Sequence, residues 1–117
     1  MKKELEKRLI NLAITINSNC KNLDNSYLSY HLTKQIIRSS TSAALNYGEA
    51  QVAESRKDFI HKISLVLKEL KETSINLKLL NNTVVDELKQ NIIKCETECN
   101  QMAAIFHKTV ITARKTQ

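Results

Sequence analysis

Four long segments of the sequence repeat apolar residues at spacings of three and four, and almost nothing interrupts them. This spacing places the apolar side chains on one face of an α-helix. The 117 residues include no proline and a single glycine, so the usual residues of tight turns and strand ends are nearly missing. We therefore predict an all-α fold with helices at about residues 2–23, 27–53, 56–80 and 84–113.

These helices predict one domain that spans residues 1–117. A compact chain of this length buries roughly two-thirds of its unfolded surface, which is enough for one core. Short connections make neighbouring helices run antiparallel, so we expect an up-and-down four-helix bundle. The connection at residues 22–26 is a polar turn with several candidate N-caps. The next two connections carry N-cap patterns, namely Ser55 with Asp58 and Thr83 with Asp86, and each pattern predicts the start of a helix.

Three of the predicted helices carry a clear core-facing stripe. The stripes are Leu5, Leu9, Leu12, Ile16 and Leu23 in the first helix, Phe59, Ile63, Val66, Leu70, Thr73, Leu77 and Leu80 in the third, and Leu88, Ile92, Cys95, Cys99, Met102, Phe106 and Val110 in the fourth. Ile10 and Ile14 lie on the opposite side of the first helix. They suggest a second contact face.

The second predicted helix differs because its central stripe is small and polar. The stripe consists of Gln35, Ser39, Ser42, Asn46, Glu49 and Ala53. Apolar residues flank it, and Ile37 and Ala44 lie on the reverse side, so little of this helix is built to face water. A helix with contacts on two sides is typical of the inner helix of an assembly, and we therefore predict a homo-oligomer.

Two hypotheses account for the polar stripe. Small residues let helices approach closely and form hydrogen bonds across the seam, and buried polar groups of this kind set register. The alternative is a ligand pocket. Arg38 flanks the stripe and Glu69 lies on the neighbouring helix, so we expect ion pairs between helices or between subunits.

Gly48 is the only glycine, and it lies near the end of the second predicted helix. A glycine inside a helix costs about 1 kcal/mol relative to alanine. It either permits close approach of a neighbouring helix or is merely tolerated.

The cysteines and histidines form no recognisable chemical site. Cys20, Cys95 and Cys99 are odd in number and form no C-x-x-C pair. Cys95 and Cys99 lie on an apolar stripe, which favours hydrophobic packing over redox or metal chemistry. A di-iron centre needs two Glu-x-x-His motifs, and only Asp58-x-x-His61 is comparable.

No histidine is paired with a nucleophile in a pattern that supports covalent catalysis. The histidines are His31, His61 and His107, which fall on three different predicted helices. We therefore predict no cofactor, no metal and no enzymatic activity.

The sequence predicts a cytoplasmic protein with no membrane contact. The N-terminal residues mix acids with bases and lack the apolar segment of a secretory signal. The longest unbroken apolar run, residues 102–106, is far short of the ~20 residues needed to cross a bilayer.

The charge indicates a polyanionic partner. The chain has 18 basic and 12 acidic residues and a formal charge of +6, which five copies would raise to +30. In an up-and-down bundle the N-terminus, the turn before the third helix and the C-terminus share one end. The predicted nucleic-acid contacts at this end are Lys2, Lys3, Arg8, Arg56, Lys57, Lys108, Arg114 and Lys115.

Such contacts would be directed at the backbone and weakly sequence-specific, since no row of base-stacking aromatic residues is evident in the sequence. The alternative is a solvated rim that only keeps the assembly in solution.

An ordered set of residues between positions 30 and 80 resembles a known family. The set is Gln35, Arg38, Ser39, Ser42, Asn46, Glu49 and Ala50, then Ser55, Lys57, Asp58 and Phe59, then Lys68, Glu69, Glu72, Thr73, Leu77, Leu79 and Leu80. It is similar to the bacterial four-helix-bundle proteins first noticed as products of intervening sequences in 23S rRNA genes. The resemblance implies an up-and-down bundle that assembles as a ring-like homopentamer.

A related branch of that family serves as the accessory protein of diversity-generating retroelements. There a basic pentamer engages a reverse transcriptase and nucleic acid, so the resemblance implies these partners as candidates. The family's usual aromatic pair after Glu72 and Thr73 is replaced here by Ile75 and Asn76.

Three functions follow in order of preference. The first is a homo-oligomeric binding or scaffold protein whose basic end recruits RNA, DNA or a nucleic-acid enzyme. The second is a structural oligomer with a protein partner and no nucleic-acid binding. The third is an enzyme, for which the sequence offers no residues.

Overall fold

The computed structural model describes residues 2–21, 23 and 26–116, which form four α-helices. The helices are α1 (Lys2–Cys20), α2 (Tyr27–Gln51), α3 (Arg56–Asn81) and α4 (Asp86–Lys115). The described part of the chain contains no β-strand. The all-α prediction is confirmed, and the predicted helix bounds differ from these by no more than three residues.

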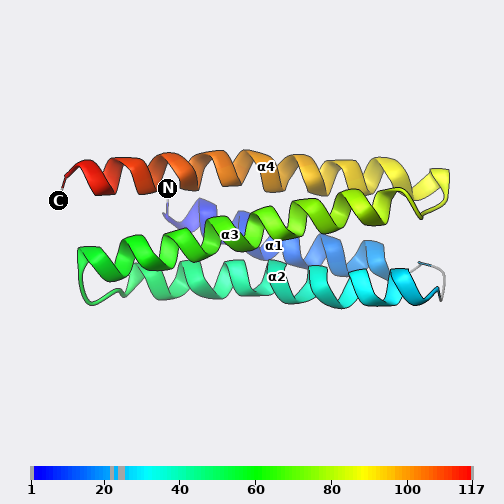
Figure 1. The fold of residues 1–117 in the computed structure, drawn as a ribbon, viewed down its shortest axis with the longest axis horizontal. Coiled ribbons are helices and arrows are strands. Elements are labelled where there is room, and N and C mark those ends of the chain that lie inside the picture. Colours follow the sequence, from blue (N-terminus) through cyan, green and yellow to red (C-terminus); the bar gives the residue numbers. More distant parts are fainter. Residues whose placement is uncertain (1, 22, 24–25, 117) are drawn as a thin grey trace.

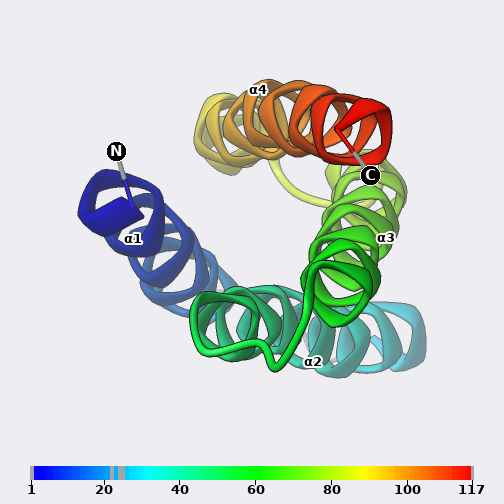
Figure 2. The same cartoon turned by 90° about the vertical axis from the view of Figure 1, so that its left-hand side faces the viewer.

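The helices lie along the long axis of a body that measures 48 × 21 × 19 Å. Each connection returns the chain toward the opposite end, so the start of α1, the turn between α2 and α3, and the end of α4 lie at the same end (Figure 1). Viewed from that end, the helices surround a common interior (Figure 2). Helices α1 and α3 each pack against both α2 and α4.

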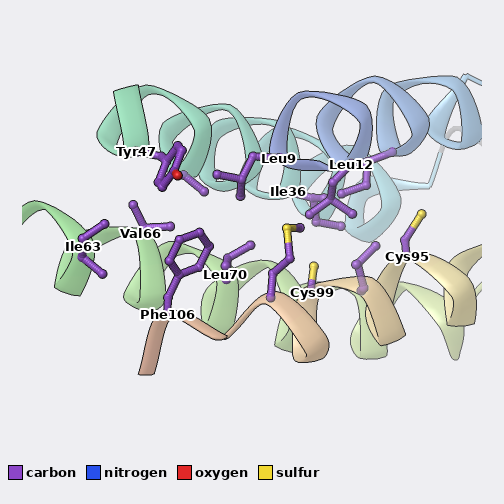
Figure 3. Packing of buried hydrophobic residues seen from close by; sticks show 14 of the residues in the cluster. Leu9, Leu12, Ile36, Tyr47, Ile63, Val66, Leu70, Cys95, Cys99 and Phe106 are labelled. Carbon is purple, nitrogen blue, oxygen red and sulfur yellow. The ribbon is translucent and has the colours of Figure 1, made fainter. Parts of the chain in front are cut away.

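The core consists largely of the apolar stripes predicted for α1, α3 and α4, and α2 adds the apolar residues beside its polar stripe, namely Leu32, Ile36, Ala43, Tyr47 and Ala50. Leu9 and Ile16 of α1, Leu70 of α3 and Phe106 of α4 are at most 1% exposed (Figure 3). The rings of Phe106 and Tyr47 lie 5.5 Å apart between centroids at a tilt of 58°, a favourable arrangement for two aromatic rings. The flanking members Leu5, Leu23, Phe59 and Leu88 are partly buried.

The N-cap prediction for α3 is confirmed. Ser55 has extended backbone angles, and its Oγ accepts a hydrogen bond from the Asp58 backbone N–H at 3.0 Å. An Asp58 carboxylate oxygen accepts in turn from the Glu54 N–H at 3.2 Å. The cap at Ser26 of α2 works in the same way, because its Oγ accepts from the Ser29 N–H. The other polar residues of that connection, at positions 22, 24 and 25, lie outside the described residues.

The N-cap prediction for Thr83 is wrong. Helix α4 begins at Asp86 and is preceded by Val85, which makes no side-chain cap bond. The Thr83 hydroxyl donates to the Leu80 carbonyl oxygen at 2.8 Å, and its backbone N–H donates to the same oxygen at 2.9 Å. Thr83 therefore closes the end of α3, because the carbonyl oxygens of the last turn of α3 need donors of their own.

Gly48 is exposed, and a Cβ built at this position meets no atom within 4 Å. Within the described chain, no segment packs so close to Gly48 that a side chain at this position would be excluded. Approach by a second copy of the chain stays a prediction.

Over the described residues, no helix is both long enough and apolar enough to cross a membrane.

Candidate nucleic-acid interface

Three segments contribute exposed basic side chains to the end of the bundle where both termini lie (Figure 1). We call this set the basic end. Its members are Lys2, Lys3 and Lys7 of α1, Arg56 and Lys57 of α3, and Lys108, Arg114 and Lys115 of α4, and all of them are exposed. Ser55 caps the N-terminus of α3. Arg56 and Lys57 are therefore the first two residues of the helix and lie at this end.

The Arg8 guanidinium is paired with a carboxylate of another helix. Its Nε and Nη2 donate to the two carboxylate oxygens of Glu98 at 2.9 and 2.7 Å, a bidentate pair that joins α1 to α4. The hydrogen bond with Arg8 lowers the pKa of Glu98, and the same bond raises the pKa of Arg8. The Arg8 guanidinium therefore already binds a carboxylate in this structure, and a phosphate contact at Arg8 stays a prediction.

Arg56 stands between two neighbouring hollows. The first has a volume of about 470 Å³ and is lined by residues that include Lys2, Gln51 and Ser55. The second, of about 600 Å³, is lined by residues that include Lys108 and Thr116. An Arg56 Nη1–H donates to the Thr116 hydroxyl, which ties the start of α3 to the end of α4.

Acidic residues reduce the positive charge of the basic end without cancelling it. Lys62, near this end, pairs with Glu49 at 2.6 Å, so these two charges compensate each other. The eight members of the basic end face four remaining carboxylates, which belong to Glu4, Glu6, Glu54 and Asp58. This surplus of positive charge favours binding of an anion.

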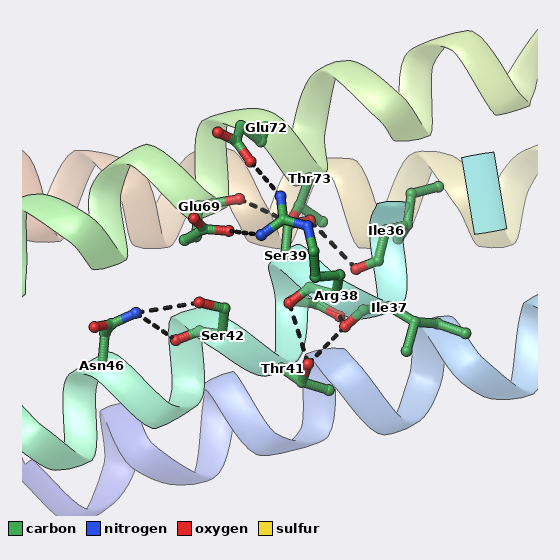
Figure 4. Close-up of polar contacts among 11 residues, drawn as sticks. Ile36, Ile37, Arg38, Ser39, Thr41, Ser42, Asn46, Glu69, Glu72 and Thr73 are labelled. Atoms are coloured by element: carbon green, nitrogen blue, oxygen red, sulfur yellow. Dashed lines mark hydrogen bonds and ion pairs between the residues drawn. The ribbon is translucent and has the colours of Figure 1, made fainter. Parts of the chain in front are cut away.

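The polar stripe of α2 forms a seam with α3 inside one chain. Arg38 donates to Glu69 at 3.3 Å and to Glu72 at 2.8 Å (Figure 4). Glu69 is only 7% exposed, so the guanidinium compensates a carboxylate that is largely removed from water. The predicted ion pairs between helices are therefore present within the single chain.

The middle of this seam is a buried pair of hydroxyl groups. Ser39 Oγ and Thr73 Oγ1 lie 2.6 Å apart and neither residue is exposed (Figure 4). The Glu69 carbonyl oxygen lies 2.8 Å from the Thr73 hydroxyl, and the Ile36 carbonyl oxygen lies 3.3 Å from the Ser39 hydroxyl. One hydroxyl of the pair therefore donates to the other, which donates in turn to the carbonyl oxygen of its own helix. Every hydroxyl group of the pair is satisfied, which fits a seam that sets the register of two helices.

Of the other polar members of the stripe, Glu49 also bonds across to α3, whereas Asn46 bonds within its own helix. Asn46 Nδ2 donates to the carbonyl oxygen and to the hydroxyl of Ser42 on its own helix, at 2.9 and 3.2 Å. Glu49 accepts from Lys62, and Gln35 is half-buried on α2. The two hollows beside Arg56 are lined by none of the polar members of the stripe, so these hollows give the ligand-pocket alternative no support.

The cysteines are free thiols that belong to the packing. Cys95 and Cys99 are buried in the core, and Cys20 is partly buried. Burial raises the pKa of the Cys99 thiol to about 12, so the reactive thiolate is not formed near neutral pH. Over the described residues, His, Cys, Asp and Glu side chains form no group of three or more that could hold a metal ion.

Sequence reasoning missed two exposed tyrosines at the start of α2. Tyr27 and Tyr30 are 90% and 65% exposed, and Lys34 Nζ lies 5.3 Å from the centroid of the Tyr30 ring. The sequence shows that aromatic residues three positions apart and followed by a lysine fall on one helix face, but it does not show that this face is exposed.

The comparisons with known proteins agree with this fold. No curated protein matches the chain. A crystal structure of a protein of unknown function from the S23 ribosomal protein family of Bacteroides thetaiotaomicron VPI-5482 is 35% identical, with a TM-score of 0.71. The match covers 87% of this chain and 97% of that one. The family model for 23S rRNA-intervening sequence proteins matches residues 2–108. The chain therefore belongs to the family of 23S rRNA-intervening sequence proteins.

Proposed function

We propose that the chain is a non-enzymatic, homo-oligomeric scaffold whose basic end binds the backbone of RNA or DNA in the cytoplasm. The observation that carries this proposal is the surplus of exposed basic side chains where the ends of α1, α3 and α4 meet. The proposal takes the helices as an antiparallel up-and-down bundle, the order that brings these three segments together.

Phosphate binding fits the chemistry of this end better than recognition of bases. Arg56 offers N–H groups beside both hollows, Lys2 lines one of the hollows, and Lys108 lines the other. Side chains of this kind bind phosphate oxygens and fix position without reading sequence. A ring of several copies would repeat the site and raise the local positive potential.

Self-association is supported by the outer face at the end of α2, which we call the outer stripe. It consists of Thr41, Leu45 and Gly48 of α2 and of Val52, the C-cap residue that follows the helix. Leu45 and Val52 are 67% and 81% exposed, although they are apolar. Thr41 directs its hydroxyl to carbonyl oxygens of its own helix, and Gly48 has open space around it. A face with small residues and unburied apolar side chains suits close packing against a second copy.

We predict that the free protein has a mass well above the 13.4 kDa of one chain, and five times that mass for the proposed pentamer. Light scattering after size exclusion at micromolar concentration measures it. Leu45→Lys should reduce the mass because it places a charge in the proposed contact. Ile75→Lys, at an isoleucine of α3 that is 59% exposed, is the matched control.

A wild-type mass of one chain would reject self-association. A dimer or tetramer would keep self-association and reject the pentamer. If Ile75→Lys reduces the mass and Leu45→Lys does not, the outer stripe is not the contact.

We predict that binding to RNA or DNA weakens steeply with salt, because each phosphate contact releases counterions. Replacing Arg56, Lys57, Arg114 and Lys115 by Gln should weaken binding equally for unrelated sequences and flatten the dependence of log K on log salt. The slope should fall by about one unit for each phosphate that the variant no longer neutralises. Fluorescence anisotropy with labelled oligonucleotides at ~50 to 200 mM salt measures both quantities.

The matched control removes the same charge elsewhere. Gln replaces Lys68, Lys71, Lys78 and Lys94, which are exposed on α3 and α4 outside the basic end. Equal losses of affinity in the two variants would mean that net charge alone attracts the nucleic acid. No binding by the wild type at ~50 mM salt would favour a structural oligomer with a protein partner. A reverse transcriptase as that partner stays a prediction of the family resemblance.

A further inference from the structure

The end of the bundle away from both termini carries a second feature that suits nucleic acid. We call it the tyrosine platform, and it consists of Tyr27 and Tyr30 at the start of α2 (Figure 1, right-hand side). A hollow of about 420 Å³ lies beside the two rings, and its lining includes Cys20, Lys21 and Thr33. Both rings are mostly exposed, although burying them would be favourable.

Basic side chains accompany the rings. Lys34 Nζ lies over the Tyr30 ring at 5.3 Å from its centroid, a distance typical of a cation–π contact. Lys21 lines the hollow from the end of α1. Between residues 20 and 34 the sequence carries these two lysines against one aspartate, Asp24, whose placement lies outside the described residues.

We propose that the tyrosine platform stacks unpaired bases of single-stranded nucleic acid, while Lys21 and Lys34 bind the phosphates beside the stacked bases. Every base has a flat π-face, so stacking on tyrosine tolerates any sequence. The inference rests on the proposed binding of nucleic acid, and it adds a preference for single strands that the basic end alone does not provide.

The charge decides between nucleic acid and a protein as the occupant. Exposed tyrosines are also common anchors in protein interfaces. Here the side chains that accompany the rings are cations, and no carboxylate lines the hollow within the described residues. A single strand of nucleic acid supplies both the flat rings and the negative charge that this arrangement lacks.

The platform is separate from the proposed contact between copies. Tyr30 and Leu45 of the outer stripe are fifteen positions apart on the helix, which corresponds to about 22 Å along the axis of α2. A second copy packed on Leu45 and Val52 therefore leaves the start of α2 accessible. Substitutions at the tyrosines should leave the oligomer mass unchanged.

The protein contains its own reporter for this site. It has three tyrosines and no tryptophan, and the third tyrosine, Tyr47, is 3% exposed and packed on Phe106. Tyrosine emission from solvent-exposed rings therefore comes from Tyr27 and Tyr30. Stacking of a base on either ring should quench this emission.

The experiment uses the full-length protein and a 12-nucleotide single-stranded RNA of mixed sequence. An abasic strand of equal length and a blunt RNA duplex are the comparison ligands. We expect quenching by the single strand, and none by the abasic strand or the duplex. The variant with both Tyr27→Phe and Tyr30→Phe keeps two rings but only the buried tyrosine, so its emission corrects for absorption of light by the bases.

Affinities from anisotropy complete the test. Tyr27→Leu and Tyr30→Leu should each weaken binding of the single strand roughly fivefold to a hundredfold and leave binding of the duplex unchanged. Tyr27→Phe and Tyr30→Phe should keep wild-type affinity, because the ring and not the hydroxyl stacks.

The outcomes separate the two proposals. Binding of the single strand without quenching, or with equal loss of affinity for single strand and duplex in the Leu variants, overturns the platform and leaves the basic end intact. A change of oligomer mass in the Leu variants assigns the tyrosines to a protein contact and also overturns it. Absence of any binding overturns the platform together with the proposed function.

Discussion

Replacing Phe106 by alanine is expected to lower the free energy of unfolding by about 3–5 kcal/mol. Phe106 is fully buried and packs against Tyr47, with its ring between α4 and the side chains of α2 and α3 (Figure 3). The loss combines the transfer of a large apolar side chain with the cavity that it leaves. The total free energy of unfolding of a domain of this size is about 5–15 kcal/mol, so the substitution removes a large share of the stability.

Urea denaturation followed by circular dichroism measures this loss. All variants are compared at one protein concentration, because self-association makes stability depend on concentration. Phe106→Leu keeps part of the volume and should lose less. Ile111→Ala, on the same helix at a residue that is 40% exposed, is the control and should change stability by no more than about 0.5 kcal/mol. Equal losses at Phe106 and Ile111 would contradict the assignment of the core.

Helical periodicity accounts for most of what the sequence predicted about the fold. In α4 the spacing alone identified Ile92, Cys95, Cys99, Met102 and Phe106, and all five are buried. A pattern of this length leaves no other face for the core. The pattern does not locate helix ends, since a threonine can serve either the helix before it or the helix after it. Thr83 serves the helix before it.

Contacts between distant segments were harder to predict. Arg8 and Glu98 are 90 residues apart, and the rotation of α1 relative to α4 decides whether their side chains meet. A sequence pattern contains no information on that rotation. The seam between α2 and α3 was easier, because Arg38 and Glu69 lie on consecutive helices joined by a short turn.

The two candidate interfaces differ in how far the sequence predicted them. Up-and-down topology and the positions of Arg56, Lys57, Arg114 and Lys115 were enough to predict the basic end. The tyrosine platform depends on exposure, and the sequence alone does not tell an exposed Tyr27 from a buried Tyr47. The tyrosine platform could therefore be identified only from the structure.

The buried thiols link the stability of the core to pH. Cys99 points from α4 into the interior, and burial raises its pKa to about 12 from an ordinary value of 9 (Figure 3). Burial also raises the pKa of Cys95, and the largest cause is again desolvation. At alkaline pH a buried thiol stays protonated in the folded protein but ionises in the unfolded chain, so the folded state binds more protons. Stability must then fall as pH rises.

We expect the contribution of Cys99 to be fully present below pH 9 and to be lost between pH 9 and about 12, at about 1.4 kcal/mol for each pH unit. The loss approaches about 4 kcal/mol at the upper limit. Urea denaturation at intervals from pH 8 to 10.5 measures the initial slope.

Cys99→Ala should be less stable at pH 8, because it leaves a cavity, but its stability should fall less steeply with pH. Cys20→Ala, at the partly buried cysteine, is the matched control and should change the slope less. If the wild type and Cys99→Ala lose stability in parallel above pH 9, the Cys99 thiol ionises in the folded protein as readily as in water, and it does not lie in the closed core that its burial indicates.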